Sequence, residues 1–256
     1  MNLLIKILLN WIPRKILISL SILLRPFLDV FFRGKKFHDP INNKSYCKFL
    51  PYGYKNIREN ALSPGSLSLE RHRLLWLYLK KETEIFQSTL KVLHIAPEQA
   101  FYQKFKKLDN IDYITYDLNS PLAQIKGDIC NMPFSENDFD IVLCNHVLEH
   151  VLDDISAIKE IYRVLKIGGF AILQVPIDMN KKLTFEDSSI TEKEERKKIF
   201  GQYDHVRIYG QDYFNRLEKS GFNVEKNFYC NNFSDEEIRK YSLNKNEIIP
   251  VCRKLV

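Results

Sequence analysis

The sequence predicts an α/β fold built on a mostly parallel sheet of seven strands. Three short apolar runs, 92–95, 113–116 and 141–144, are separated by segments long enough to form helices. Such runs are typical of buried parallel strands in βαβ units. In these sheets the ligand binds outside the carboxyl ends of the strands. Four polar residues follow the predicted strands and should converge there: Glu98, Asp117, Asp128 and Asn145.

The remaining elements are predicted in chain order from periodicity and from turn residues. Strands are expected at 91–95, 112–116, 124–127, 139–144 and 170–175. Helices are expected at 69–81, 99–107, from 153 to a stop at Gly168-Gly169, at 209–220 and at 236–241. Residues 177–208 form a polar insertion expected to cover the substrate, and segments 223–230 and 247–254 are predicted to pair antiparallel at the sheet edge.

Four short motifs in the central region carry a family resemblance. They are Gly127-Asp128, Met132-Pro133-Phe134, Phe139-Asp140-Ile141-Val142 and Val147-Leu148-Glu149-His150-Val151. Their order and spacing resemble the class I, Rossmann-like methyltransferases that use S-adenosylmethionine, over roughly residues 68–254. The resemblance implies a three-layer α/β sandwich, S-adenosylmethionine as cofactor and an unknown methyl acceptor as second substrate.

The resemblance also implies a set of cofactor-binding residues. Asp117 would accept hydrogen bonds from the ribose hydroxyls, and Asp128 would accept one from the adenine amino group beside Ile129. The alternative for Asp117 is a turn residue, because Asp117-Leu118-Asn119-Ser120-Pro121 is also a good turn. The full predicted set is His94, Ala96, Glu98, Asp117, Leu118, Asp128, Ile129, Asn145 and His146.

The first predicted loop departs from the family pattern. His94 stands where an acid is expected, and Ala96 and Ala100 stand where glycines are expected. Glycine lets the backbone approach a ligand closely, whereas Ala adds a methyl group and Pro97 removes an N–H. We expect Glu98 to hold the amino end of the cofactor's methionine moiety. The departure also motivates an alternative, a non-catalytic binding or scaffold protein that keeps the fold.

Two histidines are the predicted catalytic residues. A base assists methyl transfer when the acceptor is a hydroxyl or an amine. His205 is the first candidate for this base, with Asp204 to orient it, and His146 is the second; the alternative for His205 is a polar loop residue. His150 is expected to be a helix-packing histidine.

Two patterns raise the question of a metal ion. His146-x-x-Glu149-His150, with His205 from elsewhere, resembles the divalent-metal cluster of some small-RNA and quinone-precursor methyltransferases, but such clusters also arise by chance. Residues 34–66 have the spacing of a zinc ribbon, although no cysteine stands at any of the four ligand positions, Asp39, Asn42, Ser63 and Ser66. Without thiolates at these positions, a tetrahedral zinc site is not expected. The sequence therefore predicts that the protein binds no metal ion.

The positive charge of the chain is concentrated near its N-terminus. The net charge is +6, and residues 1–60 hold 11 Lys and Arg against 3 Asp and Glu, while the remainder holds 27 against 29. The main domain at 67–256 therefore has no basic face for nucleic acid. Residues 1–33 are apolar with a basic stripe, broken at Pro13 and Pro26. They are too interrupted to span a membrane and are predicted to lie on its surface.

Cysteine usage and the N-terminal segment predict the compartment. The five cysteines are odd in number and scattered, which is typical of reduced thiols in the cytoplasm. No small-residue cleavage site follows the apolar segment, so a secretory signal is not expected. We therefore expect a cytoplasmic protein at the inner membrane face. This location favours a lipid, a lipid-linked glycan or another membrane-bound intermediate as the methyl acceptor.

Overall fold

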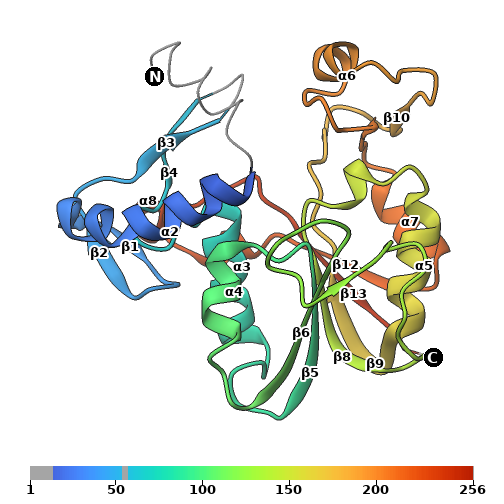
Figure 1. Ribbon diagram of the computed structural model, residues 1–256, viewed down its shortest axis with the longest axis horizontal. Helices are drawn as coiled ribbons and strands as arrows, with labels where there is room; N and C mark the ends of the chain where they lie inside the picture. The colour runs from blue at the N-terminus through green and yellow to red at the C-terminus, as the bar shows by residue number, and fades with distance from the viewer. Residues whose placement is uncertain (1–13, 54–56, 256) are drawn as a thin grey trace. The chain divides into compact units, whose positions relative to one another are not determined.

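The structure is a computed structural model that describes residues 14–53 and 57–255. The chain forms two compact units (Figure 1). Among the described residues, the N-terminal unit comprises 14–53, 57–82, 99–104 and 230–246, and the sheet unit comprises 83–98, 105–229 and 247–255. Helices α3 (Glu70–Glu82) and α8 (Asp235–Tyr241) lie in the N-terminal unit, and the division into functional segments 1–33, 34–66 and 67–256 stays a prediction.

The sheet unit is built on a seven-stranded sheet. Its strands are β5 (Leu90–Ile95), β6 (Ile111–Asp117), β7 (Ile125–Lys126), β8 (Phe139–Cys144), β9 (Leu165–Ile172), β12 (Asn223–Asn227) and β13 (Ile249–Arg253). Their spatial order is β12-β13-β9-β8-β5-β6-β7. Strand β13 is antiparallel to both neighbours, and the other pairs are parallel. The predicted mostly parallel sheet, with an antiparallel pair at its edge, is confirmed.

The strand order creates a switch point between β5 and β8. The chain proceeds from β5 outward through β6 and β7, then crosses back to β8 and continues through β9 in the opposite direction. Doubly wound sheets bind ligands at this reversal, outside the carboxyl ends of the strands. The register pairs Ile95 with Cys144, so the residues that follow these two strands lie at the same end of the sheet.

One face of the sheet is covered by α5 (Asp154–Val164) and α7 (Tyr213–Lys219) (Figure 1). Ile158, Ile161 and Leu217 of these helices are fully buried in the core of the sheet unit. Each such side chain contributes about 1.5–3 kcal/mol by its burial. Asp153 begins α5 as predicted, because its carboxylate accepts a hydrogen bond from the backbone N–H of Ser156 at 2.9 Å.

Two predicted boundaries in this region were wrong. Helix α5 ends at Val164, and Gly168-Gly169 lie inside β9, where the pairing with β8 shifts register. A Cβ on Gly169 would meet the Asp140 carbonyl oxygen at 2.7 Å, so this glycine permits close strand pairing rather than helix termination. Helix α7 begins at Tyr213 instead of at 209, because Tyr209 forms a bridge with Ile177.

The insertion at 177–208 contains β10 (Phe185–Glu186), α6 (Lys193–Ile199) and β11 (Arg207–Ile208), with β10 and β11 antiparallel. Its last residues contact η1 (Leu148–His150), the 3-10 turn that follows β8. The Val206 N–H donates to the Glu149 carbonyl at 2.9 Å, and Arg207 Nη1 donates to the Leu148 carbonyl at 2.8 Å. The end of the insertion is therefore fixed at the carboxyl end of β8.

The N-terminal unit combines helices with two small hairpins. Its elements are α2 (Arg14–Phe31), β1 (Arg33–Asp39), β2 (Lys44–Tyr46), β3 (Leu50–Tyr52), β4 (Arg58–Leu62), α3 (Glu70–Glu82), most of α4 (Gln99–Phe105) and α8 (Asp235–Tyr241); η2 spans Tyr229–Asn232. Helix α2 continues through Pro26, so the predicted break there was wrong, while Pro13 lies outside the described residues. Across residues 14–53 and 57–255, no helix combines the length and apolarity needed to cross a membrane.

In the segment with zinc-ribbon spacing, hydrogen bonds connect the first predicted ligand pair, Asp39 and Asn42, to the second pair, Ser63 and Ser66, through Asp39. The carboxylate of Asp39 is fully buried and accepts from the hydroxyls of Ser63 and Ser66. Arg73, seven positions after Ser66, has a buried guanidinium. It donates to the carbonyl oxygens of Ser68 and Tyr241 at 2.7 and 2.6 Å. Burial lowers the pKa of Arg73 to about 10.

Candidate functional site

The loop after β5 keeps a tight turn although alanine replaces the glycine that is typical of the family. Ala96 has a φ of +49°, in the left-handed region that favours glycine. Its N–H donates to the Tyr116 carbonyl at 2.9 Å, which ties the loop to β6. The backbone therefore makes the turn without glycine, at a cost of about 1–2 kcal/mol.

His94 holds the side chain of Glu98 in place. The ring of His94 is fully buried; its Nδ1 lies 2.8 Å from the Tyr113 hydroxyl and its Nε2 lies 3.1 Å from Glu98 Oε2. A carboxylate can only accept, so Nε2 carries the proton and Nδ1 accepts from Tyr113. Both nitrogens of His94 are thus engaged within the protein. Its predicted contact with the cofactor stays a prediction, and its observed contacts position Glu98.

Glu98 and Asn145 meet across the switch point. Asn145 Nδ2 donates to Glu98 Oε2 at 3.2 Å. Asn145 is only 3% exposed, and its Oδ1 is buried without a hydrogen-bond partner in the part of the chain that the structure describes. The predicted convergence of these two residues at one end of the sheet is confirmed by this contact.

Asp117 forms the turn after β6. Its Oδ1 accepts from the backbone N–H of Asn119 at 2.7 Å and from that of Ser120. The turn interpretation is therefore correct, and the ribose role remains a prediction. Leu118 follows in this turn and is 62% exposed, so its side chain is available to lie against a ligand.

Asp128 lies just beyond β7, where Tyr116 of β6 supports its backbone. The Tyr116 hydroxyl donates to the Asp128 carbonyl at 2.9 Å, and Asp128 Oδ1 accepts from the Cys130 N–H at 2.9 Å. Gly127 makes this approach possible, since a Cβ there would lie 2.2 Å from the Tyr116 hydroxyl oxygen. The carboxylate of Asp128 stays exposed, whereas Ile129 is buried.

A cluster of ionisable side chains follows Asn145. His146 has a φ of +55°, and its Nδ1 lies 3.1 Å from Glu149 Oε1. Glu149 is 2% exposed. Burial opposes its charge, but the hydrogen bond from His146 and the electrostatic interactions with His146 and His150 outweigh this and lower the pKa of Glu149. The carboxylate is therefore charged at neutral pH.

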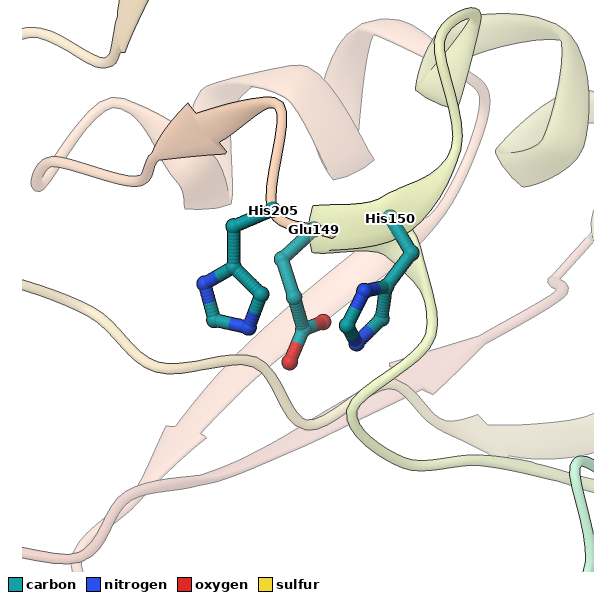
Figure 2. Close-up of side chains that lie close together, drawn as sticks. All are labelled: Glu149, His150 and His205. Carbon is teal, nitrogen blue, oxygen red and sulfur yellow. The ribbon is translucent and has the colours of Figure 1, made fainter. Parts of the chain in front are cut away.

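His150 and His205 complete this cluster, as Figure 2 shows. Their rings pack edge to face with centroids 4.7 Å apart. Burial lowers the pKa of His205, so this imidazole is neutral at pH 7. Asp204 was expected to orient His205, but its backbone oxygen lies 3.2 Å from His150 Nδ1 instead, with its Oδ2 at 3.5 Å. His150 thus contacts both Asp204 and His205 of the insertion.

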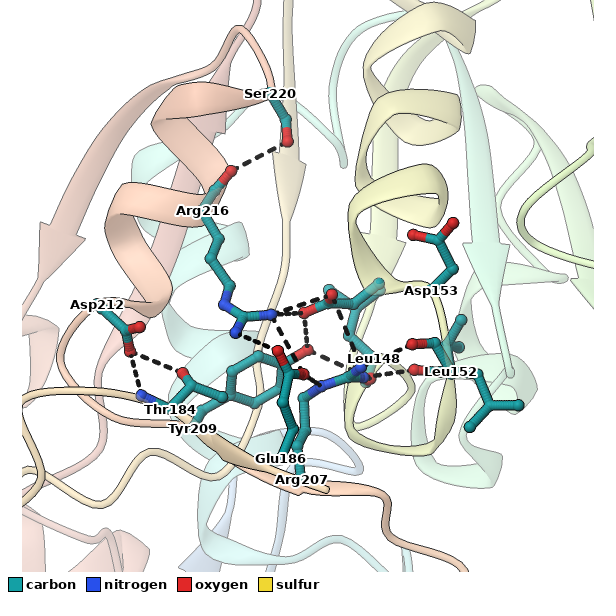
Figure 3. Close-up of polar contacts among 12 residues, drawn as sticks. Leu148, Leu152, Asp153, Thr184, Glu186, Arg207, Tyr209, Asp212, Arg216 and Ser220 are labelled. Atoms are coloured by element: carbon teal, nitrogen blue, oxygen red, sulfur yellow. Dashed lines mark hydrogen bonds and ion pairs between the residues drawn. The ribbon is translucent and has the colours of Figure 1, made fainter. Parts of the chain in front are cut away.

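A pocket of about 440 Å³ adjoins the same segments; its lining includes Leu152, Asp153, Glu186, Arg196 and Val206. An ion-pair network forms one side of it (Figure 3). Glu186 accepts from Arg207 Nε at 2.9 Å and from Arg216 Nη2 at 2.8 Å, while Asp154 accepts from Arg216 at 3.1 Å. This polar pocket was missed from the sequence. The only signal was that Lys and Arg balance Asp and Glu within 177–208.

The residues at the switch point fit S-adenosylmethionine. The orphaned Oδ1 of Asn145 and the carboxylate of Glu98 are hydrogen-bond acceptors at the predicted position of the cofactor's ammonium group. The turn at Asp117 uses one carboxylate oxygen for its backbone bonds, which leaves the other to accept from ribose hydroxyls. The glycine-like turn at Ala96 preserves the path of the first loop.

Comparison with known proteins shows which family the chain resembles. Residues 83–173 match a family model described as a methyltransferase domain. The demethylmenaquinone methyltransferase of Staphylococcus epidermidis is 39% identical over 70 residues, which cover 27% of this chain and 24% of that protein. The chloroplastic 2-phytyl-1,4-beta-naphthoquinone methyltransferase of Arabidopsis thaliana is 40% identical over 57 residues, covering 22% and 21%. The chain spans about a quarter of the length of these relatives.

Among solved structures, an S-adenosylmethionine-dependent methyltransferase from Mesorhizobium loti is similar, with a TM-score of 0.48 and 14% sequence identity. The match covers 70% of this chain and 98% of that one. The methyltransferase-domain model covers residues 83–173, and the predicted resemblance to class I methyltransferases, whose cofactor is S-adenosylmethionine, is confirmed for this part of the chain.

Proposed function

We propose that this protein transfers a methyl group from S-adenosylmethionine to a small acceptor molecule. The observation that carries the proposal is the hydrogen bond between Asn145 and Glu98 across the switch point, beside an orphaned amide oxygen. Two acceptors gathered where a doubly wound sheet binds its ligand suit the ammonium group of the cofactor. A buried acceptor with no donor is costly, and the cofactor would supply that donor.

Each predicted cofactor residue has a role in this proposal. Glu98 and Asn145 accept from the ammonium group, and Asp117 accepts from the ribose hydroxyls beside Leu118. Asp128 accepts from the adenine amino group while the Ile129 backbone contacts the ring. The loop of His94 and Ala96 holds Glu98 at the required position, and His146 follows Asn145 directly.

The bound cofactor supplies an electrophilic methyl group on a sulfonium, and the protein aligns the acceptor in line with the breaking C–S bond. We assign to His205 the role of the base that removes the acceptor's proton, and His146 is the second candidate for this role. His205 is neutral at pH 7, and its Nε2 is buried without a hydrogen-bond partner among the described residues. A neutral imidazole with a free lone pair is able to take a proton from a hydroxyl or an amine.

We further propose that the acceptor is met at a membrane surface, with the protein attached at the inner face. Five large apolar side chains near the end of α2 are between 51% and 80% exposed: Leu23, Leu24, Phe27, Val30 and Phe31. Asp29 of the same helix accepts from Lys44 and Tyr46 of β2, both at 2.5 Å. The helix is thus fixed to its unit through one face while an apolar face stays exposed.

This location favours a lipid, a lipid-linked glycan or another membrane-bound intermediate as acceptor. Two relatives carry names that refer to menaquinone and naphthoquinone methylation, which is consistent with a small acceptor of mixed polarity. The polar pocket beside Val206 would then receive the part of the acceptor that faces the protein.

Calorimetric titration of the full-length protein with S-adenosylhomocysteine tests the proposed function. We expect one site per chain with a dissociation constant below about 1 mM. Absence of binding would favour the alternative, a non-catalytic binding or scaffold protein. A lipid and glycan extract assayed with labelled S-adenosylmethionine would then identify the acceptor.

A further inference from the structure

We propose that Glu149, His150 and His205 form a binding site for a divalent transition-metal ion. One ligand atom from each residue lies within 4.8 Å of those of the other two. Figure 2 shows the carboxylate of Glu149 between the two imidazole rings. The sequence led us to expect no metal, and the spatial arrangement of these three side chains changes that expectation.

Two of the three residues present buried atoms that lack partners. Oε2 of Glu149 and Nε2 of His205 are inaccessible to solvent and make no hydrogen bond among the described residues. The two residues are 2% and 7% exposed. A buried carboxylate is costly unless it is paired with a positive charge, and a cation between these atoms would satisfy both of them.

The neighbouring hydrogen bonds orient the ligand atoms toward a common centre. His150 Nδ1 lies 3.2 Å from the carbonyl oxygen of Asp204. A carbonyl accepts, so Nδ1 carries the proton and the lone pair of His150 is on Nε2. His146 engages Oε1 of Glu149, which leaves Oε2 for the ion. Such outer contacts fix the tautomer and the direction of metal-ligating side chains.

The backbone holds the two contributing segments together without any ion. Val206, next to His205, donates from its N–H to the carbonyl of Glu149 at 2.9 Å. Arg207 Nη1 donates to the Leu148 carbonyl at 2.8 Å. Ligand atoms around a tetrahedral zinc are about 3.4 Å apart, given metal–ligand distances near 2.1 Å. Small side-chain rotations therefore bring these atoms, now within 4.8 Å, to bonding distance.

The ligand set indicates the kind of ion. Two imidazoles and one carboxylate suit Zn²⁺, Co²⁺, Fe²⁺ or Mn²⁺, whereas Mg²⁺ and Ca²⁺ prefer oxygen ligands. Three protein ligands leave a coordination position open for a water molecule or for an acceptor oxygen. The ion's role rests on the proposed methyl transfer: it would lower the pKa of a bound acceptor hydroxyl. His205 would then be a metal ligand, and the proton released from the hydroxyl would pass to His146, the second candidate base, whose Nε2 has no hydrogen-bond partner among the described residues.

The test is a titration of chelator-treated, full-length protein with Co²⁺ and with Zn²⁺. We expect one ion per chain and a Co²⁺ spectrum without the sulfur charge-transfer band, which excludes the exposed Cys47 as the ligand. His205→Ala and Glu149→Gln should each weaken binding at least about 100-fold, more than loss of an outer contact does. His38→Ala is the matched control, because His38 contacts Ser45 in the other unit, and it should bind as the wild type does.

Other results would overturn the site. Absence of Co²⁺ and Zn²⁺ binding by the wild type, or equal binding by His205→Ala, excludes it. Thermal unfolding of each variant, followed by circular dichroism, is compared with that of the wild type to separate loss of metal binding from loss of folding. His150→Ala, at a partly exposed position, provides a third ligand variant for the same comparison. Titration with S-adenosylhomocysteine separates the two proposals: if the cofactor product binds and the metals do not, only the metal site is wrong. If the metals bind and the cofactor product does not, the proposed function is wrong and the site stands.

Discussion

Asn145 Nδ2 donates a hydrogen bond to Glu98 Oε2 at 3.2 Å, although 47 residues separate the two in sequence. The parallel pairing of β5 and β8 brings the two strand ends together. His94 donates to the same carboxylate oxygen from within β5. The carboxylate is thus held by two donors before any ligand binds, which is the preorganisation that a recognition site needs.

Glu98→Gln should weaken the binding of S-adenosylhomocysteine about 10-fold or more, because a charged hydrogen bond to the ligand's ammonium group is lost. Methylthioadenosine, which lacks the amino acid end, should bind wild type and variant equally. Calorimetry with both ligands makes the comparison. An equal loss of affinity for the two ligands would show that Glu98 acts on the structure of the loop and not on the ammonium group.

Asp117→Ala should reduce affinity for S-adenosylhomocysteine by about 1–3 kcal/mol, the effect of a lost charge-assisted hydrogen bond. Part of this loss would come from the turn that Asp117 caps. Asp112→Ala is the matched control, since Asp112 is exposed near the amino end of the same strand. Unchanged affinity in Asp117→Ala would remove this residue from the site.

The fold was predictable because its signals are local. The apolar runs that became β5, β6 and β8 and the cap at Asp153 depend on neighbouring residues only. Gly168-Gly169 misled the prediction because glycine serves both helix ends and strand bulges, and only the pairing of β9 with β8 decides between these. The turn at Ala96 was also hidden, since alanine rarely adopts a positive φ.

The sequence predicted the positions of site residues that directly follow strands. It did not predict contacts between segments that are distant in sequence. Asn145 and Glu98 could be placed from the strand order alone. The contact of Asp204 with His150, and the ion pairs of Glu186 with Arg207 and Arg216, depend on how the insertion folds back on η1. No periodicity in the sequence specifies that path.

Asp39→Ala should destabilise the N-terminal unit by about 2–4 kcal/mol, the cost of leaving buried donors without an acceptor. The substitution removes the acceptor for the Ser63 and Ser66 hydroxyls and for the Ile41 N–H, and leaves these donors buried. Ser66→Ala, which removes one donor, should cost about 1 kcal/mol. Urea denaturation measures both, and zinc content should be the same in both variants because the ribbon-like positions have no thiolate. Equal stability of Asp39→Ala and wild type would contradict the assigned role.

Glu186 should make stability depend on pH in acid. Burial opposes its charge, but the hydrogen bonds from Arg216 and Arg207 outweigh this, so its folded pKa lies below the ordinary 4.5. Its contribution is complete above that value and is lost as the pH falls through the folded pKa. Glu186→Gln should therefore lose less stability than wild type between pH 5 and pH 3 in urea denaturation. The exposed Glu218→Gln is the control, and an unaltered acid profile in Glu186→Gln would show that the ion pairs contribute nothing.

The apolar face of α2 should attach the protein to anionic membranes. Leu23, Phe27, Val30 and Phe31 recur at helical spacing and are 66–80% exposed. Each side chain that enters the interface contributes about 1–3 kcal/mol, and basic residues near the surface add about 1 kcal/mol each. The full-length protein should float with anionic liposomes and be partly released by salt. Substitution of Phe27, Val30 and Phe31 by Ser should abolish flotation, whereas the control substitutions Ile167→Ser and Leu183→Ser, at exposed positions in the sheet unit, should not. If the wild type stays at the bottom of the gradient, or if the triple variant still floats, this face of α2 contacts something other than a membrane.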